Sequence, residues 1–516
     1  MRPETPSRSA ALRAALLLPL LAAPLAAAPQ EPAAQGPDGV SFEEATKRAL
    51  IFSAGANKAL QKTLNLLLEN EIERRELAGM YVAPPVPPEE LERELERQQS
   101  DFTASNPELD FWDTLRAMGF DRERYLAEMA FYARLDRTFF PPHVDDWSED
   151  LDAIFDKGNP NGLYDTVVAE LRREFEQAEK RGRTFEIPDT TKRLFLRPAI
   201  LRWLLERYPV QVPFHGLPEG VCMRVGGREV KTEDLYQDVL PFTSERERRR
   251  AEEWVRTRWA MMDWLQEKGL LLSSEEAWEQ IQADKAQYEG SPITFDQVVL
   301  QGLGFPSMNT YYEHFRLRSS LRREFPDPWD PGLLEEHLAK RALTLREGMV
   351  TVEAILFLAV HPVTGRPLLE GDSFAEARAR AEACLARLEK GEDWSTVLED
   401  CEEWPEDPDR SPLPRARNGR LEPMGRVNLR LHLGENRYQE FFLGRSVADE
   451  IFYEAEIGEV RGPVEIPRGY LIYKVLDRKE GTREFDLSGA NARDTFLVSD
   501  DLLDQRFFEV LAEVRG

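Results

Sequence analysis

The stretch that decides the fold of the C-terminal half is IGEVRGPVEIPRGYLIYKVLDR, residues 457–478. Its second half is a run of aromatic and aliphatic residues that follows a Gly/Pro-rich turn signal, which predicts a strand. An earlier run, Val350 to Val360, is β-rich in the same way. Between the two, Ser373 opens a capping box and Gly391 follows the apolar stripe, so a helix is expected between them. The pattern over 345–480 therefore indicates one α+β domain.

The order of these residues resembles the parvulin family of peptidyl-prolyl isomerases. Parvulins commonly read F-x-L-x-x-G-E-x-S-x-P-V-x-T-x-x-G-Y-H-I-I-K-V-x-D-R. The residues that carry the match are Phe452, Gly458, Glu459, Gly462, Pro463, Val464, Gly469, Tyr470, Lys474, Val475, Asp477 and Arg478. The resemblance implies a parvulin-like antiparallel sheet with flanking helices. It also implies the family's activity, rotation about an X–Pro peptide bond, whose barrier is about 18–20 kcal/mol. A catalyst of this reaction has to bind the twisted amide better than either planar form and requires no metal or cofactor.

The polar centre of the family does not carry over to this chain. In parvulins two histidines lie on neighbouring strands, one in S-H-I-L and one in G-Y-H-I-I. Ala354 and Leu471 stand at those positions here. The resemblance therefore implies a degenerate centre with no assured catalytic residue. Either the domain is a weak isomerase that uses shape and desolvation alone, or it is a non-catalytic peptide-binding module.

The apolar pocket of the family maps more closely. The position of the family's Cys or Asp falls near Trp404, with Cys401 close by, although an ordinary cysteine at a helix end is an alternative. The stretch 422–439 is longer than in the family, and we expect it to enlarge the rim of the pocket. The residues assigned to the peptide-binding pocket are Leu443, Val447, Leu421, Trp404 and Cys401.

The N-terminal half has helical periodicity. Apolar residues from Leu60 to Ile72 form one stripe, Gly79 is expected to end that helix, and Pro88 to open the next. A similar order returns later, where the helix from Trp254 to Leu265 is followed by Gly269, which suggests a duplicated helical module.

A hairpin signal precedes the second copy. Gly226 and Gly227 separate two short β-like stretches, and Thr232 is expected to cap the following helix. This order, followed by the long helix and KGLLLSSEE (268–276), resembles the N-terminal chaperone module of SurA-like proteins. Gly226 stands where that family usually has Asn.

Aromatic and methionine residues of the long helix, from Trp254 to Trp264, suggest an adaptable apolar surface, although such a stripe fits a plain core equally. The last helix, through Leu502 and Val514, is expected to pack either on a helical module, as in SurA-like proteins, or on its own domain. The fold class is thus multidomain, mostly α with one α+β domain. The expected segments are a signal peptide (1–28), a flexible leader (29–40), a first helical module (41–141), a helical connection (142–220), a second helical module (221–330), the parvulin-like domain (345–480) and a C-terminal helix (481–516).

Composition limits the partners. The 516 residues carry a formal net charge of −27, which argues against nucleic acid because phosphate binding needs concentrated Lys and Arg. The six histidines have no metal-ligand spacing, so we expect no metal and no cofactor. Arginines precede an apolar run that ends at Ala28, a pattern typical of a secretory signal peptide. No later apolar run is long enough to span a membrane.

We therefore expect an exported protein, periplasmic or extracellular. Its predicted role is that of a folding factor whose partners are unfolded or proline-containing polypeptides. An active isomerase and a structural or adaptor protein that reuses the fold for one partner are the alternatives.

Overall fold

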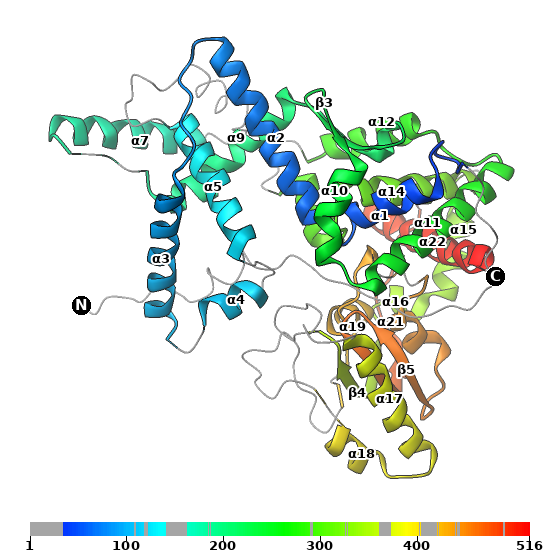
Figure 1. Ribbon diagram of the computed structural model, residues 1–516. Helices are drawn as coiled ribbons and strands as arrows, with labels where there is room; N and C mark the ends of the chain where they lie inside the picture. Colours follow the sequence, from blue (N-terminus) through cyan, green and yellow to red (C-terminus); the bar gives the residue numbers. More distant parts are fainter. Residues whose placement is uncertain are drawn as a thin grey trace. The chain divides into compact units, whose positions relative to one another are not determined.

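The computed structural model describes most of the chain, which divides into two compact units. The helical unit comprises residues 38–251 and 278–295, and the sheet unit comprises residues 252–277 and 296–516. Figure 1 shows the elements of both. The described residues are 35–107, 110–117, 122–140, 163–183, 185, 187–288, 293–325, 327, 329–360, 373–401, 403, 420–421, 423–438, 440, 444–488 and 491–515.

The signal peptide and the first half of the expected leader lie outside the described residues. Among the described residues, no helix combines the length and apolarity that crossing a membrane requires.

The helical unit packs its helices around a small antiparallel sheet of order β1-β2-β3. Leu67 of α2, Leu135 of α5 and Val225 of β2 belong to one buried core. The elements are α1 (Phe42–Phe52), α2 (Ala56–Leu77), α3 (Pro88–Ser105), α4 (Phe111–Ala117), α5 (Arg122–Phe139), α7 (Leu163–Lys180), α8 (Asp189–Thr191), η3 (Lys192–Leu196), α9 (Arg197–Arg207), β1 (Val210–Gln211), η4 (Pro213–His215), β2 (Val221–Val225), β3 (Arg228–Lys231), α10 (Thr232–Val239) and η5 (Leu240–Phe242).

Glycine and proline mark the element ends in this unit as the sequence predicts. Pro88 is the first residue of α3. Gly79, just past α2, has a φ of 67°, and Gly226 and Gly227 join β2 to β3 with φ of 55° and 88°. Such left-handed turns favour glycine because a Cβ atom is strained there. The prediction for Thr232 is wrong: it is the first residue of α10, and its hydroxyl donates to the buried Glu44 (2.5 Å) instead of capping the helix.

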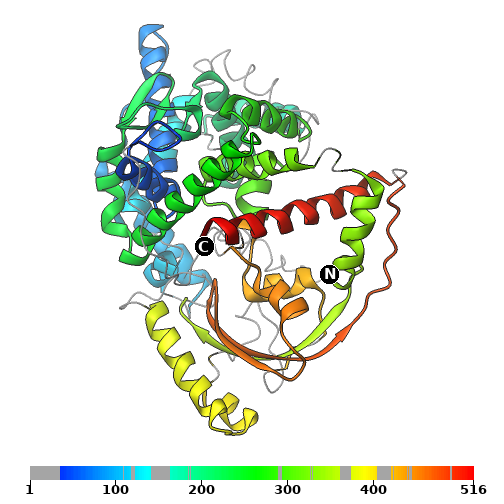
Figure 2. The same cartoon turned by 90° about the vertical axis from the view of Figure 1, so that its right-hand side faces the viewer.

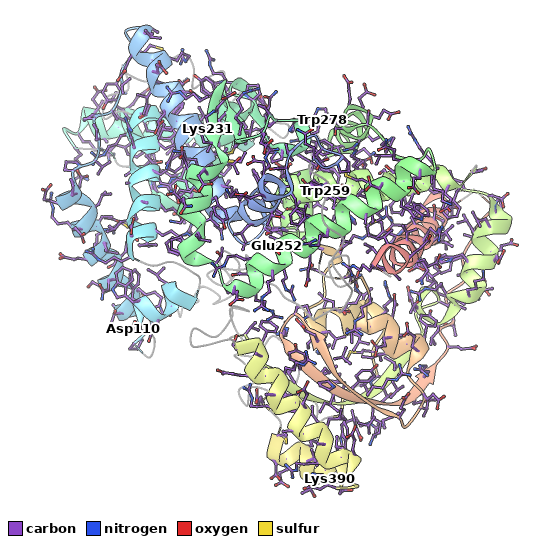
Figure 3. The ribbon with its side chains drawn as sticks, turned by 45° about the vertical axis from the view of Figure 1, so that its right-hand side comes forward. Asp110, Lys231, Glu252, Trp259, Trp278 and Lys390 are labelled. Carbon is purple, nitrogen blue, oxygen red and sulfur yellow. The ribbon has the colours of Figure 1, made fainter. Side chains whose placement is uncertain are left out.

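Three helices, α11 (Glu245–Glu267), α12 (Ser274–Ala286) and α13 (Phe295–Gln297), contain residues of both units. Figure 3 labels Glu252, where α11 enters the sheet unit, and the nearby Trp259. The predicted capping box before α12 is confirmed, since Ser273 N–H donates to Glu276 (2.7 Å) and Glu276 N–H donates to Ser273 Oγ (3.0 Å).

The sheet unit contains a second antiparallel sheet, of order β4-β6-β5. Ala354 of β4 pairs with Tyr473 of β6, and Leu356 pairs with Leu471. The remaining elements of the unit are η6 (Val298–Gly302), α14 (Met308–Leu321), η7 (Arg322–Glu324), α15 (Pro331–Lys340), α16 (Ala342–Leu345), β4 (Met349–Leu358), α17 (Ser373–Glu389), α18 (Trp394–Cys401), α19 (Arg426–Leu433), α21 (Val447–Asp449), η9 (Glu450–Glu454), β5 (Val460–Ile466), β6 (Gly469–Lys479) and α22 (Ala492–Arg515).

The two faces of this sheet are covered by different helices, because side chains alternate between faces along each strand. Ile355 and Ile472 face α17 and α18, where they form a core with Ala381. Ala354 and Leu471 face the other side, where the core includes α19, α21 and η9. Figure 2 shows the long curved sheet with the orange helices on its concave side and the yellow α17 on the other. The architecture is thus mostly α with one α+β domain, as the sequence predicts.

Candidate functional site

The residues that occupy the positions of the family's histidines are buried and not exposed in a cleft. Ala354 is 2% exposed and Leu471 1%. They lie on neighbouring strands and on one face, as the motif requires. Tyr473, directly across from Ala354, is fully buried on this face, and its hydroxyl donates to Glu450 of η9 (2.8 Å). A large aromatic therefore lies beside the alanine, where parvulins have Ile beside His.

The expected pocket residues divide between the two faces. Leu421 and Val447 share one core with Ala354 and Leu471, and Leu421 N–H donates to Val352 O (2.8 Å). Cys401, the last residue of α18, packs against the core of the opposite face, where Arg387 donates to its Sγ atom (3.5 Å). Leu443 and Trp404 lie outside the described residues. The structure therefore brings Leu421 and Val447 to the histidine positions and does not bring Cys401 there.

The longer stretch at 422–439 does not enlarge a rim. Part of it folds as α19, whose Leu429 and Leu433 are 0% and 3% exposed in the core over Ala354 and Leu471. The L-x-x-x-L spacing was the sequence signal for this, because residues four apart share a helix face. The insertion thus fills the concave face with apolar side chains.

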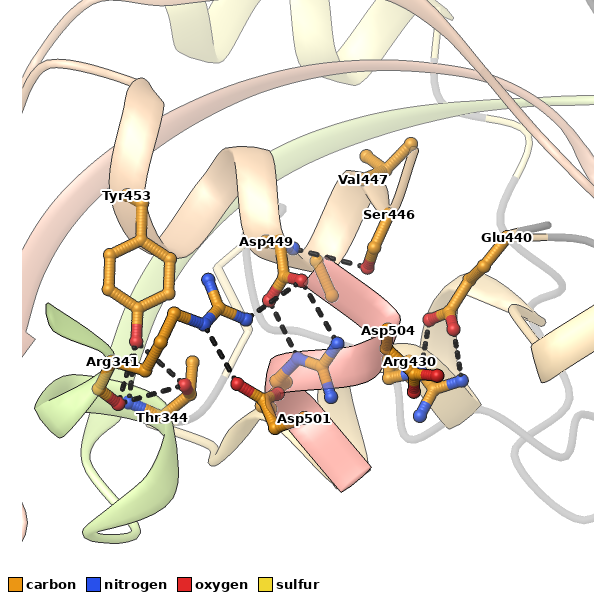
Figure 4. A network of polar contacts seen from close by, with 12 residues as sticks. Arg341, Thr344, Arg430, Glu440, Ser446, Val447, Asp449, Tyr453, Asp501 and Asp504 are labelled. Carbon is orange, nitrogen blue, oxygen red and sulfur yellow. Dashed lines mark hydrogen bonds and ion pairs between the residues drawn. The ribbon is translucent and has the colours of Figure 1, made fainter. Parts of the chain in front are cut away.

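A buried ionic network joins α19 and α21 to neighbouring helices of the unit (Figure 4). Asp449 of α21 accepts from Arg426 Nε (2.6 Å) and pairs with Arg341 (3.0 Å). Arg341 also contacts Asp501 of α22 (3.2 Å). Burial opposes ionisation of Asp501, but the hydrogen bond from His337 and the charge of Arg341 lower its pKa to about 2.

The same network explains where the last helix packs. Arg318 of α14 donates to Asp500 (2.6 Å) and Asp504 (2.7 Å) of α22, and Arg437 donates to Asp500 (2.7 Å). The pKa of Asp504 is lowered because the charges of Arg318 and Arg437 outweigh its burial. Helix α22 therefore packs on α14, within the range 221–330 expected for the second helical module.

A pair of buried carboxylates follows α19. Glu435 accepts hydrogen bonds from the N–H groups of Val447 (2.6 Å) and Ala448 (3.2 Å) at the start of α21. Glu440 accepts from Arg430 (2.6 Å). Burial and the nearby Glu440 raise the pKa of Glu435 to about 7. This carboxyl holds the ends of α19 and α21 together.

The structure thus shows an α+β domain whose face at Ala354 and Leu471 is apolar and filled. Within the described ranges, no group of three His, Cys, Asp or Glu side chains could hold a metal ion. The aromatic and methionine stripe of α11 is core: Trp254, Trp259, Met261 and Met262 are each at most 6% exposed.

No protein-family profile and no curated protein matches the sequence. Among solved structures, the chain is similar to the peptidylprolyl isomerase PrsA from Bacillus anthracis, with 12% identity, coverage of 50% of this chain and 93% of that chain, and a TM-score of 0.18. It is also similar to the peptidylprolyl isomerase PrsA from Bacillus cereus, with 13% identity, coverage of 55% of this chain and 88% of that chain, and a TM-score of 0.20. The third similar structure is PrsA from Bacillus subtilis, with 14% identity, coverage of 55% of this chain and 88% of that chain, and a TM-score of 0.15.

TM-scores of this size do not measure a shared overall arrangement. The parvulin resemblance of this chain therefore rests on its motif residues.

Proposed function

We propose that this chain is an exported folding factor that binds unfolded or extended polypeptide. Its parvulin-like domain has a peptide-binding or structural role and does not catalyse rotation about X–Pro bonds. The observation that carries the second part is the filled concave face. Ala354 and Leu471 offer no polar group to a twisted amide, and Leu429 covers them. Electrostatic stabilisation of a transition state needs polar groups placed where charge changes, and this face has apolar groups instead.

We assign part of the polypeptide binding to the helical unit, which exposes apolar side chains. Leu77 is 84% exposed and Phe242 58%. Phe242 lies under the Lys58 ammonium group, 4.4 Å from its ring centroid, which holds the ring at the surface. An extended client would gain apolar contacts there without displacing core residues.

We also infer that residues 41–141 and 221–330 are two copies of one SurA-N-like helical module. Supporting this, α2 and α11 are both long helices followed by a left-handed glycine, Gly79 with φ of 67° and Gly269 with φ of 69°. Export rests on the sequence of residues 1–28.

Two measurements test the proposal with the full-length chain. In the first, cis–trans exchange of a proline-containing tetrapeptide is followed by NMR. We expect this chain not to accelerate the exchange, whereas an active parvulin at the same concentration, measured as a reference, does. Acceleration comparable to that parvulin would refute the non-catalytic assignment.

In the second, the chain is tested for suppressing the aggregation of several unrelated unfolded proteins. We expect suppression by the wild type and a weaker effect for Phe242→Ser. Phe496→Ser is the matched control, since Phe496 is a phenylalanine of similar exposure, 55%, in the sheet unit. Equal loss in both variants would refute the assignment to the helical unit, and binding of one protein only would favour an adaptor.

A further inference from the structure

The turn between β5 and β6 carries an arginine whose charge is largely buried and forms no ion pair with the described residues. Arg468 lies in this turn, and its carbonyl accepts from Ala359 N–H (2.9 Å). Its side chain lies against the end of α19, since a Cβ atom at Gly434 would come within 2.9 Å of the Arg468 Nε atom. Burial lowers the pKa of Arg468, and no acid among the described residues opposes this. No residue in the described part of the chain forms an ion pair with it.

Three other buried arginines of the sheet unit are paired with carboxylates. Arg318 and Arg437 each contact Asp500 and Asp504, and Arg426 contacts Asp449. The chain has 94 acidic against 67 basic side chains, so acids are abundant. Guanidinium stays charged at all relevant pH values, and a buried charge without a counterion is strongly unfavourable. Among the described residues, Arg468 thus differs from these arginines in having no carboxylate partner.

His432 supplies a second group beside Arg468. It lies in the last turn of α19 and is partly buried, and its Nδ1 atom is enclosed without a hydrogen bond to the described residues. Burial, and next the charge of Arg468, lower the pKa of His432. The two side chains are therefore close enough for their charges to interact.

The end of α19 does not explain the arrangement by itself. The helix terminus carries a partial negative charge, which favours a cation there. This interaction is weak compared with the cost of removing a guanidinium from water. It would also be satisfied by an exposed side chain.

We propose that Arg468 and His432 bind a carboxylate carried by a polypeptide client, an inference that rests on the proposed function. The planar guanidinium matches a carboxylate through two parallel hydrogen bonds, and the imidazole adds a third donor. Leu431, next to His432, is 65% exposed and offers an apolar surface beside the charges. The site would thus read a chain terminus or an acidic side chain with apolar neighbours.

The test measures the pKa of His432 by NMR in the full-length protein, with the His432→Gln variant to assign its signal. The probes are a short apolar peptide with a free C-terminal carboxylate, the same peptide amidated, acetate, and inorganic phosphate. We expect the free-carboxylate peptide to raise the pKa of His432 and to bind about tenfold more tightly than the amidated peptide. In Arg468→Met the two peptides should bind equally, while Arg445→Met, a control for the lost charge, keeps the preference.

Equal affinity of both peptides for the wild type would overturn the proposal, and so would an equal response to phosphate at the same concentration. Binding of unfolded polypeptide that is insensitive to Arg468→Met would refute this site and leave the proposed function standing. A response of His432 to acetate with no polypeptide binding at all would support the anion site and refute the proposed function.

Discussion

Shortening Leu429 to alanine tests whether α19 is an integral part of the sheet's core. The side chain is fully buried in the cluster that includes Leu471 and Val447. Leu→Ala at such sites costs about 2–5 kcal/mol, the larger values arising where the surroundings cannot collapse. The Leu421–Val352 hydrogen bond and the contacts of Glu435 with α21 fix the walls of this site. We therefore expect a loss of about 3 kcal/mol.

Hydrogen exchange of the β6 amides in the full-length chain measures this loss without requiring the two units to unfold together. A loss of about 3 kcal/mol corresponds to roughly 100-fold faster exchange. Leu431→Ala is the matched control, because Leu431 lies on the same helix and is 65% exposed. Its exchange should change by no more than a few-fold. Equal effects of the two substitutions would refute the conclusion that α19 fills the concave face.

Three other changes test the ion pairs, the acid pair and the turn. Asp449→Ala should cost about 3–5 kcal/mol in unfolding free energy, because it leaves Arg426 buried and unpaired. The control Glu382→Ala removes an exposed ion pair within a helix and should cost no more than about 1 kcal/mol. Similar losses for the two variants in urea denaturation would contradict the assigned role of the network. The pKa of Glu435 lies near 7, above its ordinary 4.5, so its stabilising contribution is complete below pH 4.5 and is lost as the pH rises through 7. Glu435→Gln should flatten the decline in unfolding free energy between pH 4.5 and 7, and an unchanged decline would exclude Glu435 as its source. Gly469→Ala should prevent the sheet from forming, because its Cβ atom would lie 1.9 Å from the Phe357 carbonyl oxygen; circular dichroism and hydrogen exchange of β6 measure this. The Cβ atom of the control Gly391→Ala meets open space, so this variant should cost only about 1–2 kcal/mol for its left-handed backbone. A folded sheet in Gly469→Ala would contradict the close approach.

The local features of the fold could be predicted because they depend on neighbouring residues. The β-rich run that begins at Val350 forms β4, and the run after Arg468 forms β6. In each case the observed end of the strand lies two to four residues from the predicted end. Gly391 ends α17 with φ of 85°, and Gly226 and Gly227 turn the hairpin. These residues act through the conformation of their own backbone. No knowledge of distant contacts is needed to interpret them.

The site was harder to predict because its main features join distant segments. The motif placed Ala354 and Leu471 on adjacent strands, but it could not show that Tyr473 and Leu429 fill the space beside them. The packing of an inserted helix depends on volume in three dimensions, whereas its periodicity only indicates that one face is apolar. The partners of Arg341 are likewise more than 100 positions away in the chain, and no sequence pattern pairs them.

The acidic face of α22 has a consequence for synthesis. Arg318, Arg341 and Arg437 are translated before the segment that carries Asp500, Asp501 and Asp504. Until that segment emerges, these guanidinium groups have no carboxylates from α22. Arg341 can already pair with Asp449, but Arg318 and Arg437 must remain hydrated. The sheet unit therefore reaches its final packing only after translation has passed residue 504, and a ribosome stalled before that point would carry a nascent chain that is loosely folded and sensitive to proteases.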